Sequence, residues 1–116
     1  MEPTISVSRR LARVAVETQN ADLPAEVIQK AKRAVLDWLG SCMAGALERP
    51  ARIAQQVVSS WGVCNDATIF GAQRSSMVGA ALANGIASHI LELDDVHKGS
   101  TLHAAAPVIP PALAVA

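Results

Sequence analysis

Hydrophobic residues recur at helical spacing in several segments of the chain, and short polar or proline-containing segments separate them. Residues 4–18 place aliphatic side chains on one face and arginines on the opposite face, which predicts an amphipathic helix. Residues 24–47 begin with a proline that suits a first helical turn, and their first half is also amphipathic. The second half, residues 34–47, is apolar on every side. Because such a helix is normally enclosed by protein, we expect residues 34–47 to be buried all round.

The rest of the chain predicts three more helices. Residues 51–61 carry apolar side chains at helical spacing, and Gly62 follows as a predicted C-cap. Residues 77–91 carry small side chains on every face, which is typical of a central helix packed tightly all round. A pair of prolines predicts the start of a last helix at about residue 110. Residues 66–70 favour a strand, but one strand makes no sheet, so the sequence predicts an all-α fold of about five helices.

Composition limits the classes of function. At 116 residues the chain is at most one ordinary domain, with 51% hydrophobic but only 3% aromatic residues. Ten basic residues balance ten acidic ones, so the chain lacks the positive charge typical of a nucleic-acid-binding protein. Two cysteines make no disulfide framework and fit a reducing, intracellular environment. The longest apolar runs are shorter than the ~20 residues of a membrane span, so neither nucleic acid nor membrane is predicted as a partner.

One stretch, residues 92–103, concentrates the polar chemistry. It holds the carboxylates of Glu92, Asp94 and Asp95 and two of the three histidines. It follows directly on the predicted helix 77–91, and negative charge at the C-terminal end of a helix opposes the helix dipole by ~0.3–1 kcal/mol per charge. Sequences that break such a local rule often do so at functional sites. The stretch is therefore the first candidate for a functional site.

Four interpretations of this stretch remain open from the residues alone. Asp95, His97 and His103 could bind a metal, although their spacing matches no established metal-binding motif. Carboxylates beside histidines could carry out general acid–base chemistry, with Lys98 binding an anion. Alternatively, the carboxylates cap local backbone N–H groups and pair with Lys98, or the small-residue helices form a subunit contact. The residues support acid–base chemistry and local capping about equally.

Residues in several segments match the pattern of one protein family. Residues 80–89 read Ala-Ala-Leu-Ala-Asn-Gly-Ile-Ala-Ser-His, and Glu-Leu-Asp-Asp at 92–95 and then His103 follow. The Leu-Asp-Trp-Leu-Gly run at 36–40 and Gly71 add weaker support. In this order the chain resembles the MmgE/PrpD family over essentially its whole length.

The resemblance implies an enzyme that acts on small di- and tricarboxylates. The family includes 2-methylcitrate dehydratase, cis-aconitate decarboxylase and iminodisuccinate epimerase. Its members combine a large helical domain with a smaller α+β domain, are usually homodimers, and need neither a metal nor an organic cofactor. They are several times longer than this chain, so the resemblance implies that residues 1–116 are the N-terminal portion of the helical domain, without its remainder and without the α+β domain.

The resemblance also implies which residues form the site. The predicted catalytic residues are Glu92, Asp94, Asp95 and His103, the predicted substrate-binding residues are Asn84, His97 and Lys98, and none is predicted to bind a metal. Relatives commonly have proline after the histidine, where this chain has Ala104. We expect a cofactor-independent lyase of the dehydratase type, acting on a substrate such as 2-methylcitrate. The alternatives are a decarboxylase or epimerase of the same family and, in another class, a non-catalytic helical dimerisation segment.

The resemblance places further catalytic residues beyond the stretch that this chain holds. We therefore expect the 116-residue chain alone to be inactive. The measurement is turnover of 2-methylcitrate and of cis-aconitate by the purified chain, and measurable turnover of either would refute this expectation.

Overall fold

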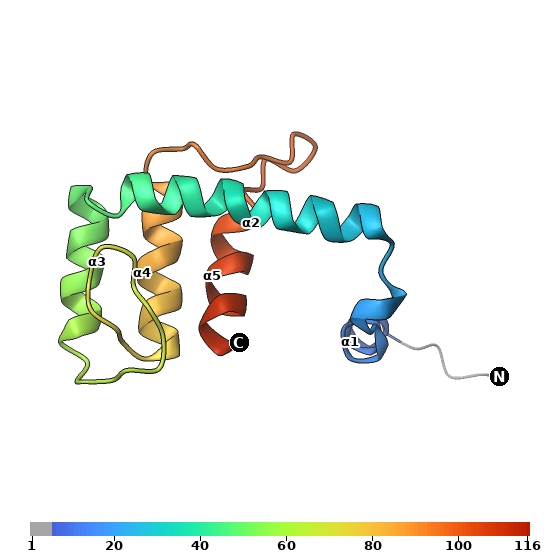
Figure 1. Ribbon diagram of the computed structural model, residues 1–116, viewed down its shortest axis with the longest axis horizontal. Helices are drawn as coiled ribbons and strands as arrows, with labels where there is room; N and C mark the ends of the chain where they lie inside the picture. The colour runs from blue at the N-terminus through green and yellow to red at the C-terminus, as the bar shows by residue number, and fades with distance from the viewer. Residues whose placement is uncertain (1–5) are drawn as a thin grey trace. The chain divides into compact units, whose positions relative to one another are not determined.

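The computed structural model describes residues 6–116, and these residues form five α-helices and no strand (Figure 1). The prediction of an all-α fold with about five helices is therefore confirmed. The chain divides into two units, residues 1–31 and 32–116, and the boundary falls within helix α2 (Ala25–Gly45).

The described part of the first unit contains helix α1 (Val7–Glu17) and a short 3-10 turn (Asn20–Asp22) before α2 begins. The Ser6 hydroxyl accepts a hydrogen bond from the backbone N–H of Arg9 at 3.4 Å and so caps α1. The amphipathic helix predicted over residues 4–18 is confirmed over the range of α1, and residues 4 and 5 lie outside the described part of the chain.

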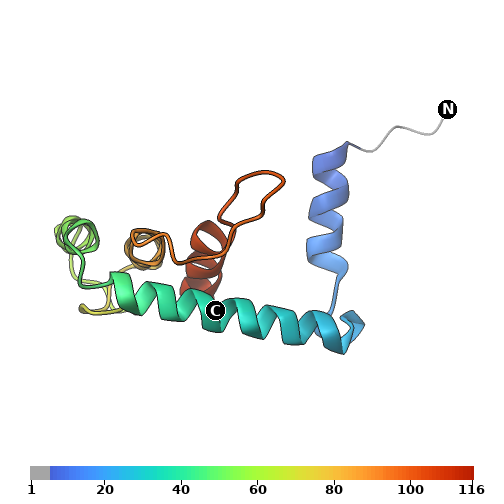
Figure 2. The same ribbon diagram turned by 90° about the horizontal axis from the view of Figure 1, so that it is seen from above.

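The second unit is built around helix α4 (Met77–His89). Helix α3 (Arg49–Ser59) packs against one side of α4, and helix α5 (Ala105–Val115) packs against another. The part of α2 that belongs to this unit runs across the end at which α4 finishes and α5 begins (Figures 1 and 2). Ser76 caps α4, because its hydroxyl accepts a hydrogen bond from the Gly79 N–H at 3.1 Å.

Small residues let neighbouring segments approach α4 very closely. A Cβ at Gly45 of α2 would overlap the carbonyl oxygen of Ala87, and a Cβ at Gly79 would lie 3.3 Å from the Cβ of Val58. A Cβ at Gly85 would lie 3.2 Å from the carbonyl oxygen of Ala106 in α5. The prediction of a tightly packed central helix therefore holds on the sides of α4 that face these three neighbours.

Helix α5 begins at Ala105, about five residues before the predicted start, so that prediction was wrong. Prolines favour the first turn of a helix, but Pro110 and Pro111 lie inside α5. Pro110 has no N–H to donate to the carbonyl of Ala106, and this carbonyl faces Gly85 at close range. The true start is set by a side chain from an earlier loop, as described below.

The expectation that residues 34–47 and 77–91 are buried all round was also wrong within this chain. In α2 the buried residues form one stripe at helical spacing, consisting of Trp38, Ser41, Cys42 and Gly45. On other faces, Leu36 is 69% exposed, Met43 is 60% exposed and Val78 of α4 is 72% exposed. These helices have described neighbours on some sides only, and their remaining apolar surface is uncovered.

Two buried clusters form the core of the second unit. Trp38, Cys42, Ala46, Ala51, Ala87 and Ala105 form the first cluster, and Val58, Ala67, Ile69, Ala80 and Ala83 form the second. The Trp38 ring meets the Phe70 ring edge-on, with centroids 5.9 Å apart. Burial raises the pKa of the Cys42 thiol to about 11, and its Sγ donates to the carbonyl oxygen of Asn84 at 3.5 Å. This thiol stays protonated at neutral pH, as expected of a packing residue.

The segment between α3 and α4 forms an ordered loop. Ala67 and Ser75 exchange two backbone hydrogen bonds of 3.0 and 2.9 Å, which make an isolated bridge rather than a strand. The Arg74 guanidinium donates to the carbonyl oxygens of Asn65 and Asp66, at 2.9 Å each, and to the Thr68 hydroxyl at 3.1 Å. The prediction that residues 66–70 form no sheet is confirmed for this part of the chain.

Among the described residues, no helix combines the length and the apolar character required to cross a membrane.

Two glycines of α2 test the close packing of α2 on α4. Gly45→Ala is expected to lower the free energy of unfolding by ~1–3 kcal/mol, because the new methyl group overlaps the Ala87 carbonyl. Gly40→Ala is the matched control. No described atom beyond its own helix backbone lies within 4 Å of a Cβ at Gly40. Because alanine favours a helix more than glycine does, this change is expected to raise the free energy of unfolding by ~1 kcal/mol. Urea unfolding measures both, and equal effects would contradict the packing described here.

Candidate functional site

A groove of about 570 Å³ runs between α4 and α5 and carries the candidate site at one end. The described residues that line this α4–α5 groove are Ala81, Leu82, Gly85, Ile86, His89, Ile90, Thr101, Leu102, His103, Ala106 and Pro107. Most of them are apolar, and the exceptions include two of the three histidines of the chain. The groove therefore places two imidazole rings at an otherwise apolar surface.

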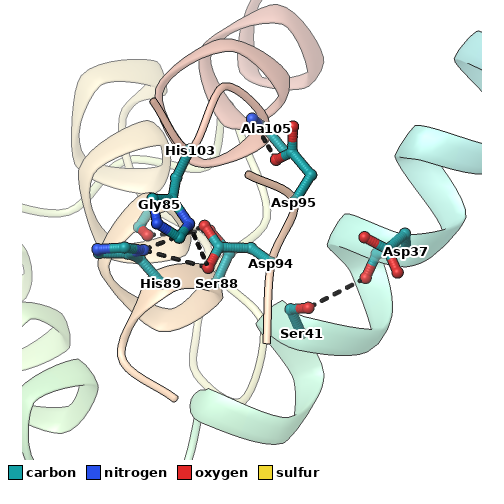
Figure 3. A network of polar contacts seen from close by, with 9 residues as sticks. All are labelled: Asp37, Ser41, Gly85, Ser88, His89, Asp94, Asp95, His103 and Ala105. Atoms are coloured by element: carbon teal, nitrogen blue, oxygen red, sulfur yellow. Dashed lines mark hydrogen bonds and ion pairs between the residues drawn. The ribbon is translucent and has the colours of Figure 1, made fainter. Parts of the chain in front are cut away.

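The turn that ends α4 brings Asp94 back against His89. The Glu92 N–H donates to the His89 carbonyl oxygen at 2.9 Å, and Glu92 itself has a positive φ of 51°. After this reversal, both carboxylate oxygens of Asp94 lie within hydrogen-bonding distance of His89 Nδ1, at 3.2 and 3.1 Å (Figure 3). The charged Asp94 side chain is fully buried and has this ring as a partner.

His103 faces Asp94 from the segment that leads into α5. Its Nδ1 lies 3.3 Å from Asp94 Oδ1, which is close enough for an ion pair. The contact is not aligned as a hydrogen bond, so the buried Nδ1 has no hydrogen-bonding partner among the described residues. The rings of His89 and His103 meet edge-on with centroids 4.8 Å apart. Both rings point toward one carboxylate in Figure 3, and we call these three residues the Asp94 triad.

The contact with Asp94 bears on the chemistry available to His89. An ionised carboxylate only accepts hydrogen bonds, so a hydrogen bond from His89 to an ionised Asp94 requires the proton on Nδ1. In the neutral ring this leaves Nε2 as the unprotonated, basic nitrogen. A buried carboxylate that orients an imidazole in this way is a known arrangement for general acid–base catalysis.

Asp95 has a structural contact instead of a place in this triad. Its Oδ1 accepts a hydrogen bond from the backbone N–H of Ala105 at 2.9 Å, at the first residue of α5 (Figure 3). A carboxylate at this position satisfies a free N–H group and interacts favourably with the helix dipole. The capping interpretation therefore describes Asp95, and its predicted catalytic role stays a prediction.

The other predicted residues of the stretch lie at exposed positions. Glu92 is exposed in the turn after α4. His97 and Lys98 are exposed in a small hairpin, in which the His97 N–H donates to the Leu102 carbonyl oxygen at 2.9 Å. The His97 Nδ1 lies 2.8 Å from the Ser100 hydroxyl. Neither His97 nor Lys98 is part of the described lining of the α4–α5 groove, so their predicted substrate-binding roles depend on movement of this hairpin or on a different substrate position.

Asn84 is buried on a different side of α4. Its Oδ1 accepts a hydrogen bond from the Phe70 N–H at 3.0 Å, and its Nδ2 donates to the Thr68 carbonyl oxygen at 2.9 Å. The amide thereby joins α4 to the loop between α3 and α4. These two contacts give Asn84 a structural role, and its role in substrate binding stays a prediction.

His89 is the residue that the sequence analysis did not assign to the site. The sequence signal that could have indicated it is the separation of five residues between His89 and Asp94, across the end of a helix. Periodicity along a helix relates residues three or four apart, and it does not predict which side chain a following turn brings back.

Comparison with known proteins shows the family of the chain. Residues 9–116 match the MmgE/PrpD N-terminal domain, and the chain belongs to the MmgE/PrpD family. It is 28% identical over 115 residues to the cis-aconitate decarboxylase-like protein oryM of Aspergillus oryzae, covering 98% of this chain and 24% of that protein.

A second relative is the cis-aconitate decarboxylase of Aspergillus terreus. The two are 30% identical over 90 residues, which cover 77% of this chain and 18% of the relative. The chain thus spans about a quarter or less of the length of the curated relatives that it matches. No solved structure matches it.

Two substitutions of Asp95 distinguish the capping role of this residue from its predicted catalytic role. Asp95→Ala is expected to lower the free energy of unfolding by ~1 kcal/mol, whereas Asp95→Asn retains a capping oxygen and most of the stability. Chemical unfolding measures this difference. An Asn variant as unstable as the Ala variant would contradict the capping role, and a stable Asn variant that loses turnover in the complete protein would support the catalytic one.

Proposed function

We propose that the complete protein is a cofactor-independent lyase that acts on a small di- or tricarboxylate by proton transfer next to a carboxylate. The observation that carries this proposal is the Asp94 triad, in which one buried carboxylate contacts two imidazoles at the end of a groove. Membership of a family that includes cis-aconitate decarboxylases supports it.

The proposed mechanism uses the two histidines as a base and an acid. Asp94 holds the proton on Nδ1 of His89, so Nε2 can accept a proton from the substrate carbon next to a carboxylate. The product of this step is an enolate-like intermediate. His103, whose ring lies 4.8 Å from that of His89 between centroids, is placed to return a proton to the intermediate or to the leaving group.

The charge of the α4–α5 groove determines whether its residues alone could bind a polycarboxylate substrate. Among the described residues that line the groove there is no lysine and no arginine, although a polycarboxylate requires positive groups to bind it. Lys98 is the nearest such residue in sequence to the triad, and it lies on the neighbouring hairpin. The remaining cations have to come from outside this groove, which agrees with the expectation that the chain alone is inactive.

The triad does not select one reaction. Dehydration and epimerisation can follow proton removal next to a carboxylate, whereas decarboxylation forms a carbanion by loss of CO2 and then takes up a proton, for which the same acid is suited. The names of the relatives place cis-aconitate first among the substrates to assay, followed by 2-methylcitrate, the substrate expected from the sequence. A homodimer and a cytoplasmic location are parts of this proposal, and the exposed apolar faces of α2 and α4 provide surface for a subunit contact.

The proposal is tested by two variants in the complete protein. His103→Ala removes the proposed acid, and Asp94→Asn removes the charge that holds the proton on His89. Each is expected to lower kcat by about a hundredfold or more, because positioned acid–base groups contribute ~10²–10⁴ in rate. Turnover of cis-aconitate and 2-methylcitrate is the measurement.

Asp66→Asn is the matched control, since Asp66 is an exposed aspartate of the loop between α3 and α4. It is expected to keep full turnover. Normal kcat in folded Asp94→Asn protein would contradict the mechanism. A wild-type protein that forms dimers but converts neither substrate would favour the non-catalytic dimerisation role.

A further inference from the structure

The apolar walls of the α4–α5 groove have no part in the mechanism proposed above. Apart from Thr101 and the two histidines, the described residues that line the groove are all apolar. Small-molecule sites typically have volumes of ~300–1,000 Å³, mainly apolar walls and a few polar groups, and this groove of about 570 Å³ has that character. We propose that the substrate carries an alkyl chain longer than methyl, which lies in the α4–α5 groove. This inference rests on the proposed function and names the class of its substrate.

Two rows of side chains on α4 give the groove its shape. Leu82, Ile86 and Ile90 follow one another at four-residue spacing and form an aliphatic ridge. Ala81 and Gly85 form the neighbouring row, which ends at the imidazole of His89. Small side chains therefore leave a channel beside the ridge, and this channel leads to the proposed base.

The channel is longer than a methyl group requires. The row from Ala81 to His89 covers eight residues of α4, or ~12 Å at the rise of an α-helix. Helix α5 lies beside α4 and contributes Ala106 and Pro107 to the lining (Figure 1). We infer that the reacting carbon lies at the histidines and that the chain extends along α4 towards Ala81.

Away from its histidines, the groove is a poor site for a carboxylate. A carboxylate that leaves water without gaining a charged or hydrogen-bonding partner is strongly disfavoured. The described lining holds no lysine or arginine, and the hydroxyl of Thr101 already donates to the Ser100 carbonyl oxygen at 2.7 Å. An alkyl chain gains free energy from burial there, whereas a substrate made only of carboxylate and hydroxyl groups leaves most of the groove without a matching group.

Two other occupants would also cover an apolar groove, namely a second copy of the chain and another segment of the protein. The alkyl chain of a substrate is favoured because the groups of the proposed chemistry, His89 and His103, belong to the lining itself. A contact between protein surfaces does not require such groups. A groove covered by protein would also show no preference for the length of an alkyl chain, and the experiments below measure this preference.

The first test measures binding without turnover. Calorimetric titration of the complete protein compares hexylsuccinate with methylsuccinate, two dicarboxylates that differ only in alkyl length. A fully buried methylene contributes about fourfold in affinity and a partly buried one less, so hexylsuccinate is expected to bind at least about thirtyfold more tightly. Equal affinities would overturn the proposal.

Substitutions test whether the chain lies in this groove. Ala81→Leu fills the channel and is expected to remove most of the preference for hexylsuccinate. Ala34→Leu is the matched control, since Ala34 is an exposed alanine of α2 outside the described lining, and it is expected to keep the preference. Loss of the preference in both variants would contradict the proposal. So would an Ala81→Leu protein that changes its oligomeric state but not its preference, because the groove would then be a subunit contact.

Circular dichroism checks the helix content of each variant. If Ala81→Leu does not fold, Leu82→Ala decides the test, because Leu82 is 43% exposed and its truncation removes part of the ridge. This variant is expected to lower the preference for hexylsuccinate, and an unchanged preference would overturn the proposal.

Turnover separates this inference from the proposed function. Replacing 2-methylcitrate by 2-hexylcitrate is expected to lower KM and to leave kcat unchanged, because the outer methylenes bind equally in the ground state and the transition state. A protein that prefers hexylsuccinate but converts no substrate would contradict the lyase function and support the alkyl site. A protein that converts cis-aconitate but binds both succinates equally would contradict the alkyl site alone.

Discussion

The arrangement of the second unit depends on how closely its other segments approach α4. Small residues on α4 and glycine at Gly45 of α2 allow carbonyl groups and side chains of neighbouring elements to lie where a Cβ would otherwise be. In a close-packed interior such contacts leave little freedom to shift. The same contacts fix the end of α4 and the beginning of α5 relative to each other, and the candidate site lies between these two points.

The candidate site follows from that arrangement together with two short-range interactions. The turn after α4 reverses the chain and buries Asp94 against His89, and Asp95 then fixes the start of α5 next to His103. Adjacent aspartates thus have different tasks, one as a partner of imidazoles and one as a helix cap. Of the two interpretations that the residues alone supported equally, capping describes the contact of Asp95, and acid–base chemistry at Asp94 is a proposal.

Sequence reasoning recovered the parts of the structure that depend on local spacing. The helices of residues 7–17, 49–59 and 77–89 and the absence of a sheet in the described chain follow from the periodicity of apolar residues. It missed the start of α5, because the cap comes from Asp95 ten residues earlier. It also missed His89, whose partner is brought back by a turn with a positive φ at Glu92, a conformation uncommon for a residue other than glycine.

The exposed apolar faces of α2 and α4 show a different limit of sequence reasoning. An apolar helix predicts that something covers it, but not which segment or partner does so. Leu36, Met43 and Val78 remain exposed among the described residues. The fold class and family were therefore within reach of the sequence, whereas the burial of individual residues required the three-dimensional arrangement.

The central claim is that buried Asp94 fixes the orientation and the proton of His89. Nuclear magnetic resonance of the histidine side chains in ¹⁵N-labelled protein, without added metal, measures this most directly, since it distinguishes a proton on Nδ1 from one on Nε2. The account predicts that neutral His89 carries its proton on Nδ1 and loses this preference in Asp94→Asn. A neutral His89 with its proton on Nε2, unchanged by Asp94→Asn, would contradict it.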